Sequence, residues 1–258
     1  GGVGRFGCCW GTWQVSILPY IEQGNMYSRY QNSGGLDPFP RYSHPNNRPV
    51  VSTRLPTLTC PSDTPNAPIL NITSHNYAVN YGNTSFFQTT LNGITFKGAP
   101  FMCYTGSTSA DGPPPPYNNP ASLPQVFGAN VPLANMTDGT SSTMMAAEVL
   151  QGRSNDLRGF TWWGGASGFV TYMAPNSSSP DVITGGICKS TLVGPRMPCT
   201  TATTVTQPRM MGSRSLHVGG VQAAFCDGHV SFISDSIDYN MWNALGTASG
   251  AETFSGDY

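Results

Sequence analysis

The most regular alternation of apolar and polar residues lies near the end of the chain, over 221–226 and 229–233. A period of two is typical of strands with one buried face. The dipeptide Asp227-Gly228 between the two runs favours a two-residue type I′ turn, which needs a positive φ at both central residues. These features predict a β-hairpin. The side chains expected on its shared face are Val221, Ala223, Phe225, Val230 and Phe232.

Other periodic segments predict short helices and further strands. Residues 12–30 carry apolar side chains at helical spacing, with Pro19 near the start, and indicate a short amphipathic helix. Strands are expected over 71–81, 142–150 and 160–173, and a C-terminal helix over 237–245. Together these elements predict one α+β domain over residues 1–258, built on an antiparallel β-sheet.

Glycine and proline shape the connections between these elements. The chain holds 30 Gly and 22 Pro, so long irregular loops are expected at 31–50 and 100–124. The second loop contains consecutive prolines at 113–116 and favours the polyproline conformation. We interpret it as a surface excursion or contact arm of the same domain, because the ordered motifs described below lie on both sides of it.

Composition narrows the classes of function. Only 10% of the residues are charged and the net charge is −1, which leaves no basic surface for nucleic acid. A hydrophobic fraction of 38% indicates a folded domain rather than a disordered chain. Low charge together with many Asn, Ser and Thr residues suits an extracellular, assembly-forming or glycosylated surface.

Several ordered motifs run along most of the chain. Near its end, His217, nine further residues and Asp227-Gly228 form an H-x9-D-G pattern. The other motifs are 17–27 (ILPYIEQGNMY), 60–63 (CPSD), 76–82 (NYAVNYG), 137–143 (TDGTSST) with Glu148, and Arg158-Gly159 followed by Trp162-Trp163 and Pro175-Asn176. In this order they resemble a large bacterial family of prepilin-like proteins, related to type IV pilins and pseudopilins, whose biochemical role is poorly defined.

The resemblance implies a location and an architecture. Family members carry a type IV pilin-like signal and an apolar helix at the N-terminus, and a pilin-like globular domain outside the cytoplasmic membrane. The present chain opens with a Gly-rich segment, 1–9, and has no apolar run near the roughly 18 residues that a spanning helix needs. We therefore expect the pilin helix to be absent from this chain, and membrane contact only through such a helix.

The seven cysteines match no zinc or redox spacing, since the chain has no C-x-x-C. For an exported chain we expect disulfides. Cys188 and Cys199 enclose a loop rich in Gly, Pro and Thr and are predicted to pair. Cys60 and Cys103 are expected to pair with each other or with one of the vicinal cysteines 8 and 9. An odd number leaves at least one thiol free or linked to another subunit.

The H-x9-D-G residues are expected to be structural rather than catalytic. Ten residues of extended strand span roughly 33 Å, so His217 and Asp227 should lie at opposite ends of the hairpin. Extrapolating the two-residue-turn register places His217 near Asp238, and we predict that His217 bonds the 236–238 region as a clasp. Asp227 and Gly228 then serve the turn.

Metal binding is a weaker alternative at several carboxylates. Asp227 with His229 could hold a divalent cation, and Asp138 or Asp63 could do so with loop carbonyls. Calcium is the ion that suits carboxylate and carbonyl oxygens in an extracellular loop. No EF-hand spacing is present, and no other cofactor is expected. Glu148, inside an apolar run, is either a buried carboxylate held by Arg or backbone N–H groups, or a ligand.

No enzyme signature is present, so we do not expect an enzyme. The chain lacks a G-x-S-x-G elbow, an H-E-x-x-H motif and a phosphate-binding glycine loop. N-x-Ser/Thr sequons, which arise readily by chance in such a composition, mark candidate glycosylation sites at Asn71, Asn83, Asn135 and Asn176.

Two functions of different kinds remain open. The first is a structural subunit of an extracellular filament, pilus-like assembly or sheath, formed by self-association. Its intersubunit contacts are expected at loop aromatics such as Tyr104, Tyr117 and Phe127. The second is an exported carbohydrate-binding module in which Trp162 and Trp163 stack on sugars. Burial of these two tryptophans would argue against the second function.

Overall fold

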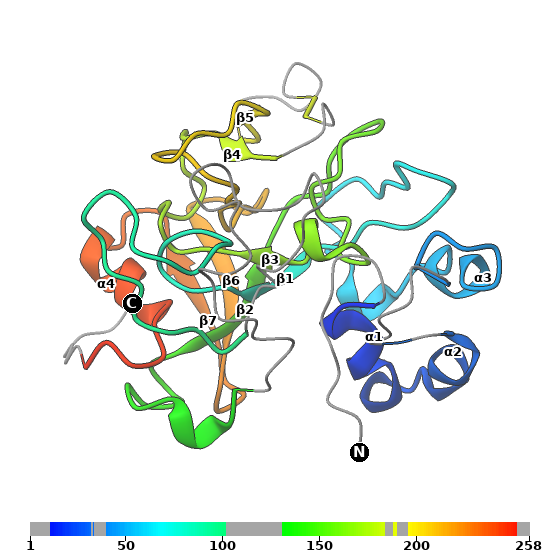
Figure 1. Ribbon diagram of the computed structural model, residues 1–258, viewed down its shortest axis with the longest axis horizontal. Coiled ribbons are helices and arrows are strands. Elements are labelled where there is room, and N and C mark those ends of the chain that lie inside the picture. The colour runs from blue at the N-terminus through cyan, green and yellow to red at the C-terminus, as the bar shows by residue number, and fades with distance from the viewer. Residues whose placement is uncertain are drawn as a thin grey trace, which may run out of the picture.

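A five-stranded β-sheet organises the part of the chain that the structure describes (Figure 1). The computed structural model describes residues 11–31, 33, 40–101, 131–183, 188–189 and 196–251. In sheet order the strands are β3 (Gly168–Phe169), β1 (Tyr77–Asn80), β2 (Met144–Glu148), β6 (Gly220–Phe225) and β7 (Val230–Ser234). Neighbouring strands are antiparallel except β1 and β3, which are parallel. The predicted α+β class is confirmed.

Short helices and a small second sheet surround the five strands. The remaining elements are α1 (Trp13–Ile17), η1 (Leu18–Ile21), α2 (Gly24–Arg29), α3 (Arg48–Val51), η2 (Pro56–Leu58), η3 (Leu133–Asn135), η4 (Gly164–Ala166), β4 (Asp181–Val182), β5 (Cys199–Thr200) and α4 (Tyr239–Leu245). α1, α2 and α3 lie to one side of the sheet and α4 to the other (Figure 1). None of the helices in the described ranges is long and apolar enough to cross a membrane.

The helix expected over 12–30 is divided into three pieces. Thr12 caps α1 by accepting a hydrogen bond from the N–H of Gln14. Pro19 has no N–H to continue the α-helical hydrogen-bond pattern, and the chain continues as η1 instead. This piece ends at Glu22, which takes a left-handed φ of +61°. The sequence period is therefore correct, but proline and a left-handed residue break the helix.

The hairpin of β6 and β7 forms as predicted, but with a different turn. Gly228 takes a φ of +96°, its N–H donates to the carbonyl of Phe225 at 3.0 Å, and the N–H of Phe225 donates to the carbonyl of His229 at 2.9 Å. This is a three-residue connection with a glycine bulge rather than a two-residue type I′ turn. The extra residue moves the register by one position, so that Ala224 rather than Phe225 lies opposite Val230.

The register shift determines which side chains of β7 are buried. Val221, Ala223 and Phe225 of β6 are buried as predicted, but Val230 and Phe232 are 64% and 42% exposed. Ile233, opposite Val221, takes the buried place instead. A one-residue slip exchanges the two faces of a strand, so the expected burial of Val230 and Phe232 is wrong.

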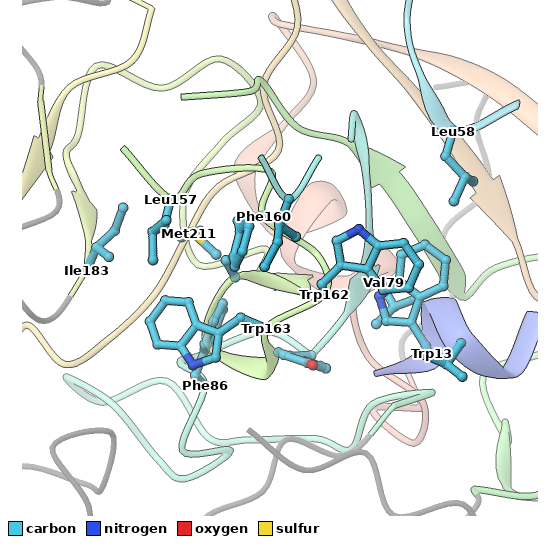
Figure 2. Close-up of a cluster of buried hydrophobic side chains, with 14 of the residues drawn as sticks. Trp13, Leu58, Val79, Phe86, Leu157, Phe160, Trp162, Trp163, Ile183 and Met211 are labelled. Atoms are coloured by element: carbon cyan, nitrogen blue, oxygen red, sulfur yellow. The ribbon is translucent and has the colours of Figure 1, made fainter. Parts of the chain in front are cut away.

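Buried side chains form two clusters on either side of the sheet region. One cluster packs β6 and β7 residues against Trp242 of α4. The other contains the aromatic segment after β2 together with the first helices, and Figure 2 shows Trp13, Trp162 and Val79 within it. The indole N–H of Trp13 donates to the Ser167 carbonyl at 2.8 Å, so this buried aromatic ring also has its polar atom paired.

The cysteine chemistry is partly as expected. Cys188 and Cys199 form a disulfide, with Cα atoms 5.8 Å apart. Cys60 is instead a free and buried thiol whose sulfur lies 3.6 Å from the imidazole of His217. Its expected pairing is therefore wrong, and Cys103 lies outside the described residues. Cys226 is a second free thiol, and burial followed by the charge of Asp227 raises the pKa of Cys226 to about 11.

Candidate functional site

Three chemically different side chains meet where β2 ends. Glu148 is the last residue of β2, Cys60 follows η2, and His217 lies in the loop before β6. The Nε2 atom of His217 is 3.0 Å from Oε1 of Glu148 and 3.6 Å from the sulfur of Cys60. Cys60 and Glu148 are buried, whereas the His217 side chain is 33% exposed. The cluster is thus an internal site with one solvent-facing wall.

Each member of the cluster is held by a hydrogen bond to a residue outside it. The second carboxylate oxygen of Glu148 accepts from the N–H of Gln222 at 2.8 Å. The carbonyl of His217 accepts from Arg196 at 2.8 Å. The N–H of Cys60 donates to the Asn76 side chain at 3.0 Å. These bonds orient the three functional atoms toward one another.

The arrangement differs from a catalytic triad in one respect. In a triad the base uses one ring nitrogen for the nucleophile and the other for the carboxylate. Here the same nitrogen of His217 faces both Cys60 and Glu148, so no relay runs through the ring. A sulfur, a nitrogen and an oxygen donor that all lie within 4.8 Å of one another could instead share a metal ion.

Tyr77 forms a further part of this environment. It lies directly opposite Glu148 in the β1–β2 ladder. Burial, followed by the charges of Glu148 and Cys60, raises the pKa of Tyr77. The phenol therefore stays protonated next to the acidic members of the cluster.

A second polar network fixes the CPSD segment beside the cluster. The carboxylate of Asp63 accepts from Asn76 at 2.7 Å, from the N–H of Gln151 at 2.8 Å and from Arg153 at 2.7 Å. The Gln151 side chain in turn donates to Asn76 at 2.7 Å. Because Asn76 also bonds the backbone of Cys60, Asp63 sets the position of the thiol indirectly.

Two arginines and two aspartates form a buried ionic network. Arg158 contacts Asp156 at 2.8 Å and Asp181 at 3.3 Å, and Arg214 contacts Asp181 at 3.1 Å. Burial alone lowers the pKa of Arg158, but the hydrogen bonds and charges of Asp156 and Asp181 together outweigh it and leave that pKa raised. The network joins the segment after β2 to β4 and to the segment before β6.

The residues of these networks lie in most of the motif segments. The family match spans the same part of the chain. A family model described as "Protein of unknown function (DUF1559)" matches residues 2–240. The chain belongs to this family. No curated protein and no solved structure matches it. Within the DUF1559 chain, the motif residues can now be compared with their predicted roles.

The predicted clasp of His217 is wrong. Its ring bonds Glu148 and Cys60 rather than the 236–238 region. The one-residue register shift alone would still leave His217 opposite residue 237, but the ladder ends at Gly219, whose φ is +84°, and does not extend to His217. Asp238 has a different task, since its carboxylate caps α4 by accepting from the N–H groups of Asn240 and Met241.

Asp227 and His229 form a local pair at the hairpin turn. The ring of His229 lies 2.7 Å from the Asp227 carboxylate, which also accepts the His229 N–H at 3.0 Å. These bonds and the charge of His229 lower the pKa of the exposed Asp227. Among the described residues, the only group of three close metal-ligating side chains is the Cys60 cluster. The Asp227–His229 pair therefore gains no third ligand there.

The first of the two alternatives for Glu148 is confirmed. It is a buried carboxylate held by a backbone N–H, and its other oxygen contacts the ring of His217. Asp138 is likewise occupied by internal bonds to the backbone of Gly250 and Ala251. The oxygens of both carboxylates thus bond groups of the domain itself, unlike those of an open calcium-binding loop.

Trp162 and Trp163 do not form a binding platform. They are 0% and 7% exposed, and Figure 2 shows both rings among the buried side chains. The tryptophan positions proposed for sugar stacking are thus core positions. Two adjacent tryptophans do not by themselves indicate that both faces of the segment are buried, as they are here.

The four sequons differ in accessibility. Asn83 is 1% exposed and bonds Thr95 and Lys97 backbone atoms, so it cannot carry a glycan in the folded domain. Asn176 is half-buried and bonds Asp235 at 2.7 Å. Asn71 and Asn135 are exposed. The predicted contact residues Tyr104, Tyr117 and Phe127 lie outside the described residues.

Sequence reasoning missed the partners that build the networks. Gln151, Asp181 and Arg214 belong to no recognisable motif, and their partners are distant in sequence. Only the unusual occurrence of charged residues inside apolar segments could have marked Asp181 and Arg214, because charges are rarely buried unless paired.

Proposed function

We propose that this domain is an exported structural subunit that associates with further copies of itself in an extracellular filament, pilus-like assembly or sheath. It works without catalysis. The likeness of its motifs to prepilin-like proteins supports export and assembly. The single structural observation that carries the proposal is the open edge of the main sheet at β7.

β7 is the last strand of the sheet, and no other described strand pairs with its outer edge. The residues that flank β7 mark the hydrogen-bonded pairs of the hairpin, because the carbonyl of His229 accepts from Phe225 and the N–H of Asp235 donates to Gly219. Pairs alternate along an antiparallel ladder, so the backbone groups of Val230 and Phe232 point toward the open edge. Such an edge is a template for pairing with another chain.

The side chains of this edge are also suited to an interface. Val230 and Phe232 lie two residues apart and share one face of β7, where they are 64% and 42% exposed. Exposed apolar side chains beside a free strand edge favour association. A symmetric contact between two β7 edges closes a dimer, whereas a filament needs β7 to meet a different surface of the next copy.

The polar residues of the motifs support a structural role. Asp63, Asn76, Arg158 and Asp181 are buried and bonded within the domain. Their hydrogen-bonding capacity is used to hold segments together rather than offered to a substrate. A subunit that must keep its shape in an assembly has this requirement.

Carbohydrate binding is the second candidate function, at a groove that does not involve Trp162 or Trp163. An open groove of about 530 Å³ lies between Tyr172, Pro180, Gln207 and Tyr239. Aromatic and amide side chains in a groove are suited to sugars. Here the hydroxyl of Tyr239 bonds the Tyr172 carbonyl at 2.9 Å.

Concentration-dependent sedimentation and negative-stain electron microscopy test the assembly proposal. We expect ordered multimers for the native protein, and their loss in Phe232→Lys and Val230→Lys. The matched control is Val205→Lys, because Val205 is a similarly exposed apolar residue in a loop. Monomers at all concentrations, or equal loss in the control variant, would contradict a role for β7. Binding of glycans that Tyr239→Ala removes would favour the second candidate.

A further inference from the structure

One site in the domain brings together ligands that proteins use for transition metals. Cys60 offers a thiol, His217 an imidazole and Glu148 a carboxylate oxygen, and the three atoms lie within 4.8 Å of one another. They come from three separate motif segments, at sequence separations of 69 for Glu148 and His217 and 157 for Cys60 and His217. We propose that Cys60, Glu148 and His217 bind a zinc-class transition-metal ion. This inference does not depend on assembly through β7.

The distances fit a tetrahedral ion. Bond lengths of about 2.3 Å to sulfur and about 2.0–2.1 Å to nitrogen place these two ligands roughly 3.6 Å apart at a tetrahedral angle. The sulfur of Cys60 and Nε2 of His217 are 3.6 Å apart. Nitrogen and oxygen ligands would be roughly 3.4 Å apart, against 3.0 Å between His217 and Glu148. A rotation of the partly exposed imidazole supplies this difference.

The surrounding bonds orient the ligands as an outer shell does. The N–H of Gln222 occupies one oxygen of Glu148 and leaves the other facing His217. Asn76 holds the backbone of Cys60 and is itself held by Asp63. Outer partners of this kind fix ligand geometry and typically change metal affinity by about 10–100-fold when removed.

The donor set selects the kind of ion. A thiolate and an imidazole favour zinc and its neighbours, whereas calcium and magnesium prefer oxygen ligands alone. The thiolate and the carboxylate together balance a charge of two. Binding releases the proton of the Cys60 thiol to solvent and leaves the His217 proton on Nδ1, so that Nε2 is free to bind the ion.

The fourth position of this ion faces solvent. Cys60 and Glu148 are 6% and 2% exposed, but the His217 side chain is 33% exposed. Three protein ligands with an open fourth position are typical of sites that keep a water or accept an external ligand. The site therefore differs from the closed four-ligand centres that only stabilise a fold.

Cobalt titration of the untagged, metal-stripped protein tests the proposal directly. Co²⁺ replaces Zn²⁺ and reports thiolate ligation by a near-ultraviolet charge-transfer band, and tetrahedral geometry by visible d–d bands. We expect saturation at one equivalent and complete displacement by one equivalent of Zn²⁺. No thiolate band at saturating Co²⁺ would overturn the proposal without reference to any variant. A non-reducing mass map that places Cys60 in a disulfide would do the same.

Variants then assign the ligands. Cys60→Ser should remove the charge-transfer band, and His217→Gln should weaken Zn²⁺ binding by more than about 100-fold, beyond the usual effect of an outer partner. Cys226→Ser and His229→Gln are matched controls, because they alter the other free thiol and the other histidine–carboxylate pair. Both controls should bind as the native protein does. A band that survives Cys60→Ser but disappears in Cys226→Ser would refute the assignment. Circular dichroism checks that each variant is folded.

Discussion

The imidazole Nε2 of His217 lies 3.0 Å from the carboxylate of Glu148, although their sequence separation is 69. This contact joins the loop before β6 to the end of β2, the neighbouring strand. The histidine of the H-x9-D-G pattern therefore connects two strands of the sheet, while the Asp-Gly pair of the same pattern shapes the turn between β6 and β7. The residues of this one motif therefore have two separate structural roles.

Replacement of Glu148 by Ala should destabilise the domain by about 1–3 kcal/mol, because it leaves the half-buried N–H of Gln222 without its acceptor. The measurement is urea unfolding of the metal-free protein. Asp227→Asn is the control, since it alters a histidine–carboxylate pair at the solvent-exposed turn and should leave the midpoint unchanged. Equal midpoints for Glu148→Ala and the native protein would contradict the structural role given to this carboxylate.

The sequence predicted the class of the fold because its signals were local. Alternation placed Val221, Ala223 and Phe225 correctly on the buried face of β6. The wrong burial of Val230 and Phe232 has a definite cause: Asp-Gly is compatible with two turns whose registers differ by one residue, and local propensity does not choose between them.

The candidate site could not be predicted in the same way. Cys60, Glu148 and His217 approach one another only through the pairing of β1, β2 and β6. The cysteine spacing excluded the familiar zinc patterns, which place two ligands close together in sequence. Ligands that come singly from three distant segments leave no such spacing to detect.

Replacement of Arg158 by Met should cost about 3–5 kcal/mol of unfolding free energy, because it leaves the buried carboxylates of Asp156 and Asp181 short of their counter-charge. Chemical denaturation followed by fluorescence of the buried tryptophans measures the change. Arg29→Met is the control, since Arg29 is an exposed residue of α2 and should change stability by less than about 0.5 kcal/mol. A loss as small as that of the control would show that the network contributes little.

Acid should destabilise the domain through His75. Burial, followed by the charge of Arg54, lowers the pKa of this imidazole from 6.5 to about 3, and its Nε2 accepts the N–H of Leu55. The folded protein keeps the ring neutral while the unfolded chain takes up a proton. His75 therefore costs nothing above pH 6.5, and below it stability falls by about 1.4 kcal/mol per pH unit until the folded pKa is reached.

Unfolding free energies measured between pH 7 and pH 5 test this dependence, because few carboxylates titrate in that window. His75→Gln should flatten the slope, and His44→Gln, at a half-buried surface position, should keep it. A native slope that His75→Gln leaves unchanged would assign the acid sensitivity to other groups.

Removal of the Cys188–Cys199 disulfide should lower the free energy of unfolding by about 3 kcal/mol. The bond closes a short loop, with a sequence separation of 11, and a loop of this length gives a chain-entropy effect of that size. The double variant Cys188→Ala, Cys199→Ala is compared with the native protein by urea unfolding, with Cys226→Ala as a control for loss of a free thiol. Adding reductant should bring the native protein to the midpoint of the double variant and leave the double variant unchanged. If reductant lowers the midpoint of both proteins equally, a different disulfide stabilises the domain.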